Sequence, residues 1–283
     1  MRASRRLGGM RLDRRNARSH RSSKHVTFPG TGIQVAGTVH VPAGDPGTRH
    51  PAVVLLHGSG PQAHAQKSGD QLNMGFGFQI PVFDEIAEVL ADQGFVLLRY
   101  DKRSCGPFNG CADSGYVLDP ATTVESFIGD AVDAVDYLAA RPAVDPQRLF
   151  VIGHSQGGTF VPSVLEARPQ VRAGVMLSAN HRPIDAILEA ETAFARTILG
   201  GAGVPAEMVA AVAATLDELV GESVASRAGT IQREGAGGTS VAFWKSALAH
   251  GDAVPAVAAR IDRPLVLLGD TYDWNVPPAE MEA

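Results

Sequence analysis

The sequence has few of the features that mark membrane-spanning, disulfide-rich or metal-binding proteins. Only two of its 283 residues are cysteine, Cys105 and Cys111, too few for a disulfide scaffold and not spaced as zinc ligands. Whether they pair is left open, because a local disulfide requires an oxidising compartment. No stretch approaches the roughly 18 consecutive apolar residues of a membrane span. With no paired-cysteine or His-x-x-x-His spacing either, we expect no metal, no cofactor and no membrane span.

Positive charge is scarce outside the first 25 residues. The net charge is −5, but residues 1–25 hold nine Lys or Arg and one Asp, so the remaining chain carries −13. An acidic body offers no basic face, and we expect no nucleic-acid partner. The basic segment is rich in Arg and Ser, as transit peptides are, although an unstructured leader or a start at Met10 is the plainer interpretation. No signal-peptide pattern follows it, so the default expectation is a cytoplasmic protein.

From residue 25 onward, apolar runs of strand length alternate with helical patterns. The runs 25–28 and 33–41 flank a Pro-Gly-Thr-Gly turn and predict an antiparallel hairpin. The run 51–57 (PAVVLLH) is apolar throughout, as in a strand buried on both faces. Further strands are predicted at 95–100, 148–153, 171–178 and 264–268, and helices at 80–93, 122–140 and 156–167. Repeated βα units predict an α/β fold whose mostly parallel sheet is covered by helices on both faces.

Residues 181–258 differ from the rest because they show no strand pattern. Ala-rich helical segments are predicted there at 184–198, 206–219 and 241–248. This organisation divides the chain into a basic leader, an α/β core, a helical insertion and a last core strand with its following loop. Their ranges are 1–25, 26–180, 181–258 and 259–283.

The strongest chemical signal is Gly153-His154-Ser155-Gln156-Gly157, a G-x-S-x-G pattern between a predicted strand and a predicted helix. In a chain with this glycine content the bare pattern arises by chance roughly 0.2 times, so its position supplies the specificity. A tight strand-to-helix turn exposes the Ser155 hydroxyl above the sheet edge, and the flanking glycines leave room for that turn. The alternative is an ordinary βα turn in which the glycines serve close packing.

A second motif, His57-Gly58-Ser59-Gly60, directly follows a predicted buried strand. Acyl transfer passes through a tetrahedral oxyanion, which needs preorganised N–H donors. The backbone N–H groups of Ser59 and Gln156 can supply them. In the alternative, the glycines form a simple turn and His57 braces the loop.

Two acids follow the last predicted strand, Asp270 and Asp273. A carboxylate at this place can orient a catalytic imidazole and stabilise its charged form. We prefer Asp273, with Asp270 as the alternative. The acids of helix 122–140 recur every third residue, at Asp130, Asp133 and Asp136, which predicts a solvated face.

Together these motifs resemble the α/β-hydrolase superfamily, in its serine esterase and peptidase-like branch. The resemblance runs from about residue 26 to the end and includes 96–103 (VLLRYDKR), which is similar to the family's fourth strand and following loop. It implies Ser155 as the nucleophile and Asp273 as the triad acid. It also implies Ser59 and Gln156 as the oxyanion-hole residues, and a helical lid formed by the insertion.

One departure from the family pattern concerns the catalytic base. The family's histidine follows the acid in the chain, but none of the nine histidines here lies beyond Asp273. Either the sequence is truncated or another histidine serves, with His181 as the first candidate, while His57 and His154 are expected to be structural. On this basis we expect the 283-residue chain to be a poor hydrolase that associates through an unpaired edge at 264–268.

The sequence thus predicts a serine hydrolase that cleaves small carboxylic esters through an acyl-enzyme intermediate. A serine peptidase is the alternative among enzymes, and no residue pattern separates the two. The alternative from another class is a catalytically impaired binding protein that keeps the hydrolase pocket. The oligomeric state is left open.

Overall fold

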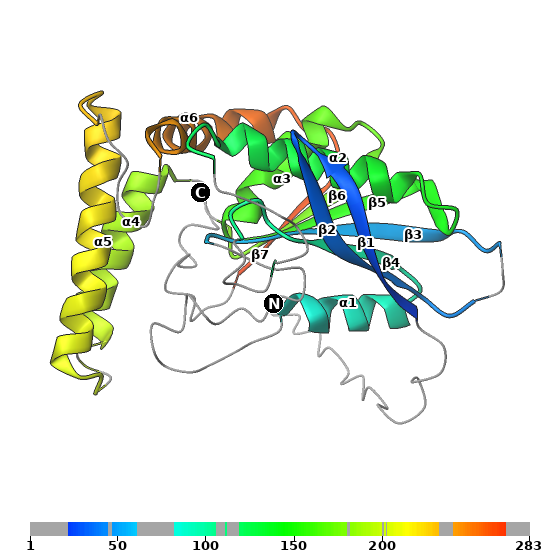
Figure 1. The fold of residues 1–283 in the computed structure, drawn as a ribbon, viewed down its shortest axis with the longest axis horizontal. Coiled ribbons are helices and arrows are strands. Elements are labelled where there is room, and N and C mark those ends of the chain that lie inside the picture. Colours follow the sequence, from blue (N-terminus) through cyan, green and yellow to red (C-terminus); the bar gives the residue numbers. More distant parts are fainter. Residues whose placement is uncertain are drawn as a thin grey trace, which may run out of the picture.

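A seven-stranded sheet forms the centre of the protein (Figure 1). The computed structural model describes residues 22–44, 47–60, 82–105, 111, 119–179, 182–199, 201, 203–231 and 240–269. The strands are β1 (Ser22–Gly30), β2 (Ile33–Val41), β3 (His50–Leu56), β4 (Val96–Tyr100), β5 (Val144–His154), β6 (Val171–Leu177) and β7 (Leu265–Leu268). Their order is β1-β2-β4-β3-β5-β6-β7. The β1–β2 and β2–β4 pairs are antiparallel and the others parallel, which confirms the predicted hairpin and mostly parallel sheet.

Helices cover both faces of this sheet. The helices of the described residues are α1 (Val82–Asp92), α2 (Val124–Ala139), α3 (Gln156–Ala167), α4 (Ile184–Phe194), the π-helical turn η3 (Ala195–Leu199), α5 (Ala206–Arg227) and α6 (Val241–Ala259). Helix α1 lies on one face, and α2, α3 and α6 lie on the other (Figure 1). Within the described part of the chain, no helix has both the length and the apolar character needed to cross a bilayer.

The two faces of β3 bury alternate side chains in separate clusters. Val53 and Leu55 pack with Phe83 under α1, whereas Val54 and Leu56 join the larger cluster under α2 and α3. Successive side chains of a strand point to opposite faces, so a strand covered on both sides must be apolar at every position. This is the reason for the uninterrupted apolar run.

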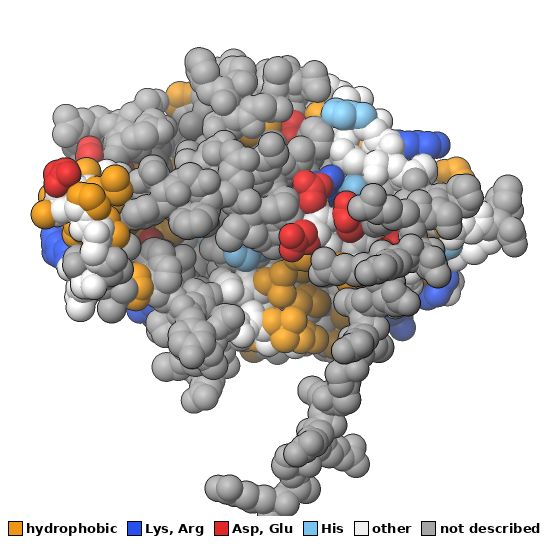
Figure 2. All heavy atoms as spheres, turned by 90° about the horizontal axis from the view of Figure 1, so that it is seen from below, with side chains coloured by type: hydrophobic (Ala, Val, Ile, Leu, Met, Phe, Trp, Pro, Cys, Tyr) orange, Lys and Arg blue, Asp and Glu red, His pale blue; other side chains and the backbone are white. Residues whose placement is uncertain are grey.

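The face that α1 covers is acidic at its surface. Glu85, Glu88 and Asp92 are exposed on this helix. Figure 2, which looks onto the molecule from below the view of Figure 1, shows acidic side chains gathered on this side. The distribution agrees with the negative charge of the chain beyond its basic first segment.

The connection from β6 to β7 is helical, and its last helix is longer than predicted. Helix α6 continues beyond residue 248 to Ala259 and packs on the core through Ala247. Gly251 lies within this helix and does not end it, and a Cβ atom at this position would lie 2.9 Å from Pro183 Cα. The glycine therefore serves a close contact between α6 and the start of α4. Arg227 of α5 forms ion pairs with Asp185 of α4 and Asp252 of α6, which hold the three helices together.

The prediction of a solvated acidic face on α2 is wrong for Asp130. This residue is 1% exposed, and its two carboxylate oxygens accept bonds of 2.8 and 2.7 Å from Arg103. Asp136, two turns further along the helix, is exposed and pairs with Arg168 at the surface. The spacing of the acids is regular, but Arg103, which follows β4, pairs with the acid in the turn that contains Asp130.

Candidate active site

Ser155 lies at the turn where β5 ends and α3 begins, at the carboxyl edge of the parallel strands. Its backbone angles are φ 51° and ψ −121°, a conformation that residues other than glycine rarely adopt. Its N–H donates to the Leu177 carbonyl oxygen of β6 at 2.8 Å. Such backbone costs about 1–3 kcal/mol and clusters at functional sites. The turn therefore has the sharp strand-to-helix geometry that the G-x-S-x-G pattern predicts.

Two glycines of the motif allow the turn to pack against the end of β3. A Cβ atom on Gly157 would lie 2.4 Å from the carbonyl oxygens of both Leu56 and His57. A Cβ atom on Gly153 would lie 2.2 Å from the Gly157 carbonyl oxygen. Since the atoms in the way are backbone atoms, neither position can accept a side chain without moving the turn.

The loop that follows β3 in the sequence lies beside Ser155. A Cβ atom placed on Gly58 would lie 3.3 Å from Ser155 Cβ and 3.1 Å from His154 Nδ1. The structure thus brings together the two motifs that the sequence singled out, although they lie about a hundred positions apart. Ser59, the next residue of the loop, is exposed at this edge.

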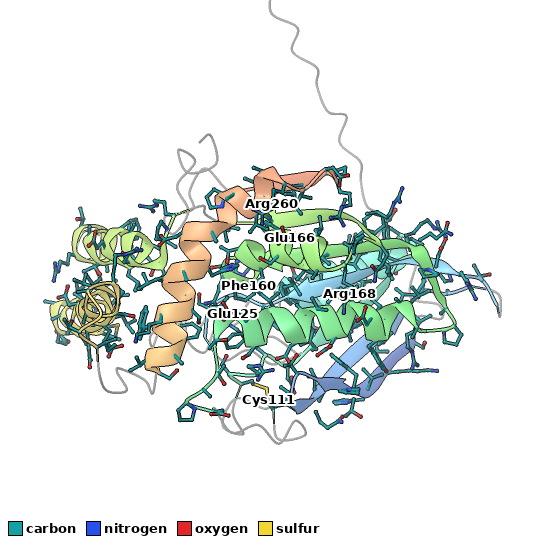
Figure 3. All side chains as sticks on the ribbon, turned by 90° about the horizontal axis from the view of Figure 1, so that it is seen from above. Cys111, Glu125, Phe160, Glu166, Arg168 and Arg260 are labelled. Atoms are coloured by element: carbon teal, nitrogen blue, oxygen red, sulfur yellow. A yellow bond between two sulfur atoms is a disulfide. The ribbon has the colours of Figure 1, made fainter. Side chains whose placement is uncertain are left out.

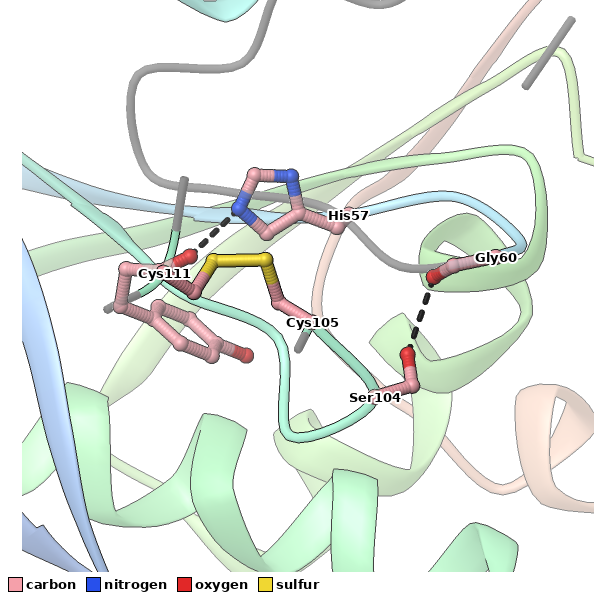
Figure 4. Close-up of a disulfide and its surroundings, with 6 residues drawn as sticks. His57, Gly60, Ser104, Cys105 and Cys111 are labelled. Atoms are coloured by element: carbon pink, nitrogen blue, oxygen red, sulfur yellow. Dashed lines mark hydrogen bonds between the residues drawn. A yellow bond between two sulfur atoms is a disulfide. The ribbon is translucent and has the colours of Figure 1, made fainter. Parts of the chain in front are cut away.

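The end of β4 and the residues that follow it contact the loop that follows β3. His57 is 3% exposed and stacks on Phe83 with ring centres 4.8 Å apart. Its Nε2 lies 2.5 Å from the Tyr100 carbonyl oxygen, which only accepts, so this nitrogen carries the proton. Ser104 Oγ donates to the Gly60 carbonyl oxygen at 3.0 Å (Figure 4). His57 therefore has the structural role that the sequence analysis expected.

A disulfide lies in the same region and joins Cys105 to Cys111 (Figure 4). Both cysteines are buried, at 1% and 2% exposure. This answers the question of pairing that the sequence left open. Disulfides persist in oxidising compartments, and the location expected by default stays a prediction.

Lys102 is a buried charge that the sequence analysis did not single out. It is 5% exposed, and its Nζ donates to the Gly58 carbonyl oxygen at 2.6 Å and to Gln156 Oε1 at 2.7 Å. Nζ also lies 5.1 Å from the centre of the Phe127 ring. Burial lowers the pKa of Lys102 to about 7. Its place in the sequence, two residues after β4, puts it at the sheet edge where ligands bind in α/β folds, but no pattern indicates that the side chain is buried.

A small cavity of about 10 Å³ lies beside this lysine, large enough for about one water molecule. Its lining includes His57, Lys102, Phe127 and Phe160. It is too small for a substrate, so it belongs to the packing behind the loop rather than to an acyl pocket.

The described histidines other than His57 also have identifiable surroundings. His250 Nε2 lies 3.1 Å from the Thr159 carbonyl oxygen, and the ring meets Phe160 edge-on. Burial lowers the pKa of His250. His181, Asp270 and Asp273 lie outside the described residues. The assignments of triad acid and base therefore stay predictions.

Comparison with known proteins identifies the family. A family model described as serine aminopeptidase, S33, matches residues 71–283. The chain belongs to this family of α/β hydrolases. Both the superfamily and the fold predicted from the sequence are confirmed.

Individual relatives of this S33 family member include esterases. Esterase EstD of Thermotoga maritima is 32% identical over 179 residues, which are 62% of this chain and 36% of the relative. Thiohydrolase apmlB of Arthrinium phaeospermum is 34% identical over 111 residues, or 38% and 34% of the two chains. The matched part spans about a third of each of these relatives. The solved structure of Est1E from Butyrivibrio proteoclasticus has a TM-score of 0.55 at 14% identity, covers 91% of this chain and 82% of that one, and shares the fold.

Proposed function

We propose that this S33 family member is a serine hydrolase that cleaves small carboxylic esters through an acyl-enzyme on Ser155. The observation that carries the proposal is the left-handed backbone of Ser155 at the β5–α3 turn. In this conformation the side chain stands clear of both strand and helix at the sheet edge, as a nucleophile must. The esterase among the curated relatives supports an ester as the substrate class.

The reaction is a double displacement. The Ser155 hydroxyl attacks the ester carbonyl carbon while a histidine takes its proton, and the resulting tetrahedral oxyanion collapses to an acyl-enzyme. The alcohol leaves with the proton from the histidine. Water then attacks the acyl group by the same steps, which releases the carboxylic acid and restores Ser155. Asp273 is assigned as the acid that orients the histidine, with His181 as the candidate base within this chain.

The oxyanion is assigned to the backbone N–H groups of Ser59 and Gln156. Gln156 is the first residue of α3, where unpaired N–H groups and the helix dipole favour negative charge. Ser59 follows Gly58, whose position beside Ser155 is set by the close contact described above. The two donors therefore approach the nucleophile from different segments.

We assign α4 and α5 as the lid over this site. In Figures 1 and 3 these helices lie beyond one end of α2 and α3, the end near Glu125 and Phe160. Ser155 lies at the same end of the sheet. Helix α6 packs on α2 and α3 and connects α4 and α5 to the core. A lid in this position restricts the substrate and excludes water during acyl transfer.

The test is a rapid-quench experiment with 4-nitrophenyl acetate. We expect a burst of nitrophenol of about one equivalent per chain, accompanied by an acetyl adduct in the intact mass of the quenched protein. Turnover without an adduct would contradict the acyl-enzyme. The matched control is 4-nitroacetanilide, which carries the same acyl group on an amide. Faster turnover of the anilide than of the ester would support the peptidase alternative. The description of the family as a serine aminopeptidase favours this alternative. If neither turnover nor an adduct were observed, the alternative of a catalytically impaired binding protein would remain.

A further inference from the structure

Lys102 connects the two segments that we assign to the oxyanion hole. Its ammonium donates to the Gly58 carbonyl oxygen behind β3 and to the Gln156 side chain at the start of α3. Lys102 itself follows β4. One buried charge therefore holds three segments of the sheet's carboxyl edge together, at a place where burying an ammonium is costly.

The bond to Gly58 fixes the direction of a particular N–H group. The Gly58 carbonyl and the Ser59 N–H belong to the same peptide unit, and in a planar trans peptide these two groups point in opposite directions. The described part of the chain contains no cis peptide bond. A donor that holds the Gly58 carbonyl therefore also aims the Ser59 N–H away from Lys102.

The same bond makes the Ser59 N–H a stronger donor. Hydrogen bonding at a carbonyl polarises the peptide, and charged donors form stronger bonds than neutral ones. The 2.6 Å distance from Nζ to the Gly58 oxygen is at the short end for such a bond. A positive charge in this place also favours negative charge that develops nearby during the reaction.

We propose that Lys102 is a positioning residue of the oxyanion hole, which aims and polarises the Ser59 N–H through the Gly58 carbonyl and stabilises the transition state without touching the substrate. The inference rests on the proposed acyl-transfer function. It assigns a role to a residue that lies outside the H-G-S-G and G-x-S-x-G motifs. The plain alternative is that Lys102 only stabilises the loop.

The two roles predict different effects on kcat. Lys102→Met keeps the length of the side chain, removes the ammonium and avoids the cost of burying a charge. A positioning role predicts that kcat falls about 10- to 100-fold, less than the 10²–10³-fold loss on removal of a whole oxyanion donor. KM should stay close to that of the wild type, because ground-state binding is retained. The loss of the donor to the Gly58 carbonyl and the Gln156 side chain lowers the melting temperature, partly offset because a charge is no longer buried. A purely structural role predicts a lower melting temperature with the kcat of the folded fraction unchanged.

A tetrahedral analogue gives the second readout. Binding of a trifluoromethyl ketone should weaken in Lys102→Met by the same factor as kcat/KM, because the analogue carries the oxyanion that the substrate lacks. Lys245→Met is the matched control, since it makes the same change at an exposed lysine of α6 and should leave kcat, KM and inhibitor binding unchanged. Ser104→Ala removes the neighbouring bond to the Gly60 carbonyl and should cost much less than Lys102→Met.

The outcomes separate this inference from the proposed function. A wild-type protein without an acyl adduct overturns both. An acyl adduct in the wild type together with unchanged kcat and inhibitor binding in Lys102→Met overturns only the role of Lys102. If Lys102→Met does not fold, Lys102→Gln takes its place. It retains an N–H donor without the charge and should show a smaller fall in kcat, and a kcat equal to that of the wild type would contradict the proposal.

Discussion

Ser155→Ala, made in a form of the protein that hydrolyses the ester, should lower kcat on the order of 10⁶-fold while the protein keeps its fold. The loss is this large because the remaining groups cannot replace the covalent step, as in other enzymes whose triad serine is removed. The substitution deletes one oxygen from a partly exposed side chain, and no described residue makes a side-chain hydrogen bond to Ser155. The measurement is kcat for 4-nitrophenyl acetate together with the melting temperature.

Ser178 provides a matched control for this variant. It is the other described non-glycine residue with a positive φ, 45°, and it directly follows β6 at the same edge of the sheet. Ser178→Ala changes the same atoms at another residue with positive φ and should retain nearly all of the activity. Equal losses in the two variants would show that backbone strain, and not the Ser155 hydroxyl, is what the mutation disturbs.

Asp273→Asn should lower kcat about 10⁴-fold, the second largest effect expected. An amide in place of the triad carboxylate holds the histidine in the wrong tautomer and does not stabilise its charged form. The measurement is kcat in a form of the protein that hydrolyses the ester through Ser155. Asp270→Asn should have a small effect, because we assign the acid to the residue further along the loop.

Asp262→Asn serves as the control for the change in charge. Its side chain is 91% exposed and lies just before β7, so the variant should behave as the wild type. A large loss in Asp270→Asn with a small loss in Asp273→Asn would exchange the roles of the two acids.

The parts of the fold that follow from local pattern could be predicted from the sequence. Helix α3 begins at Gln156 and ends at Ala167 as predicted, because the glycine-rich turn precedes it and the apolar stripe runs its full length. The predicted end of α5 at residue 219 falls eight residues short of Arg227. The pattern weakens at Gly221, a residue of low helix propensity, but the helix continues past it to Arg227.

Some residues of the candidate site could likewise be predicted from the sequence, and others could not. Ser155 and the loop at Gly58 could be found because each motif directly follows a strand, and parallel strands place such ends at one edge. Lys102 and the Arg103–Asp130 ion pair could not, because they depend on how the first residues after β4 pack against α2 and the start of α3. No spacing within the sequence encodes that packing. The pairing of the cysteines depends on the same segment.

The most direct test of the central claim is to map the residue that reacts with a fluorophosphonate probe. The probe phosphonylates a serine only where that hydroxyl is activated and the adduct's oxygen is held by oxyanion donors. The account predicts one probe per chain, on the peptide that contains Ser155, with no labelling of Ser155→Ala and unchanged labelling of Ser178→Ala. Label on a different serine, or undiminished label on Ser155→Ala, would contradict it.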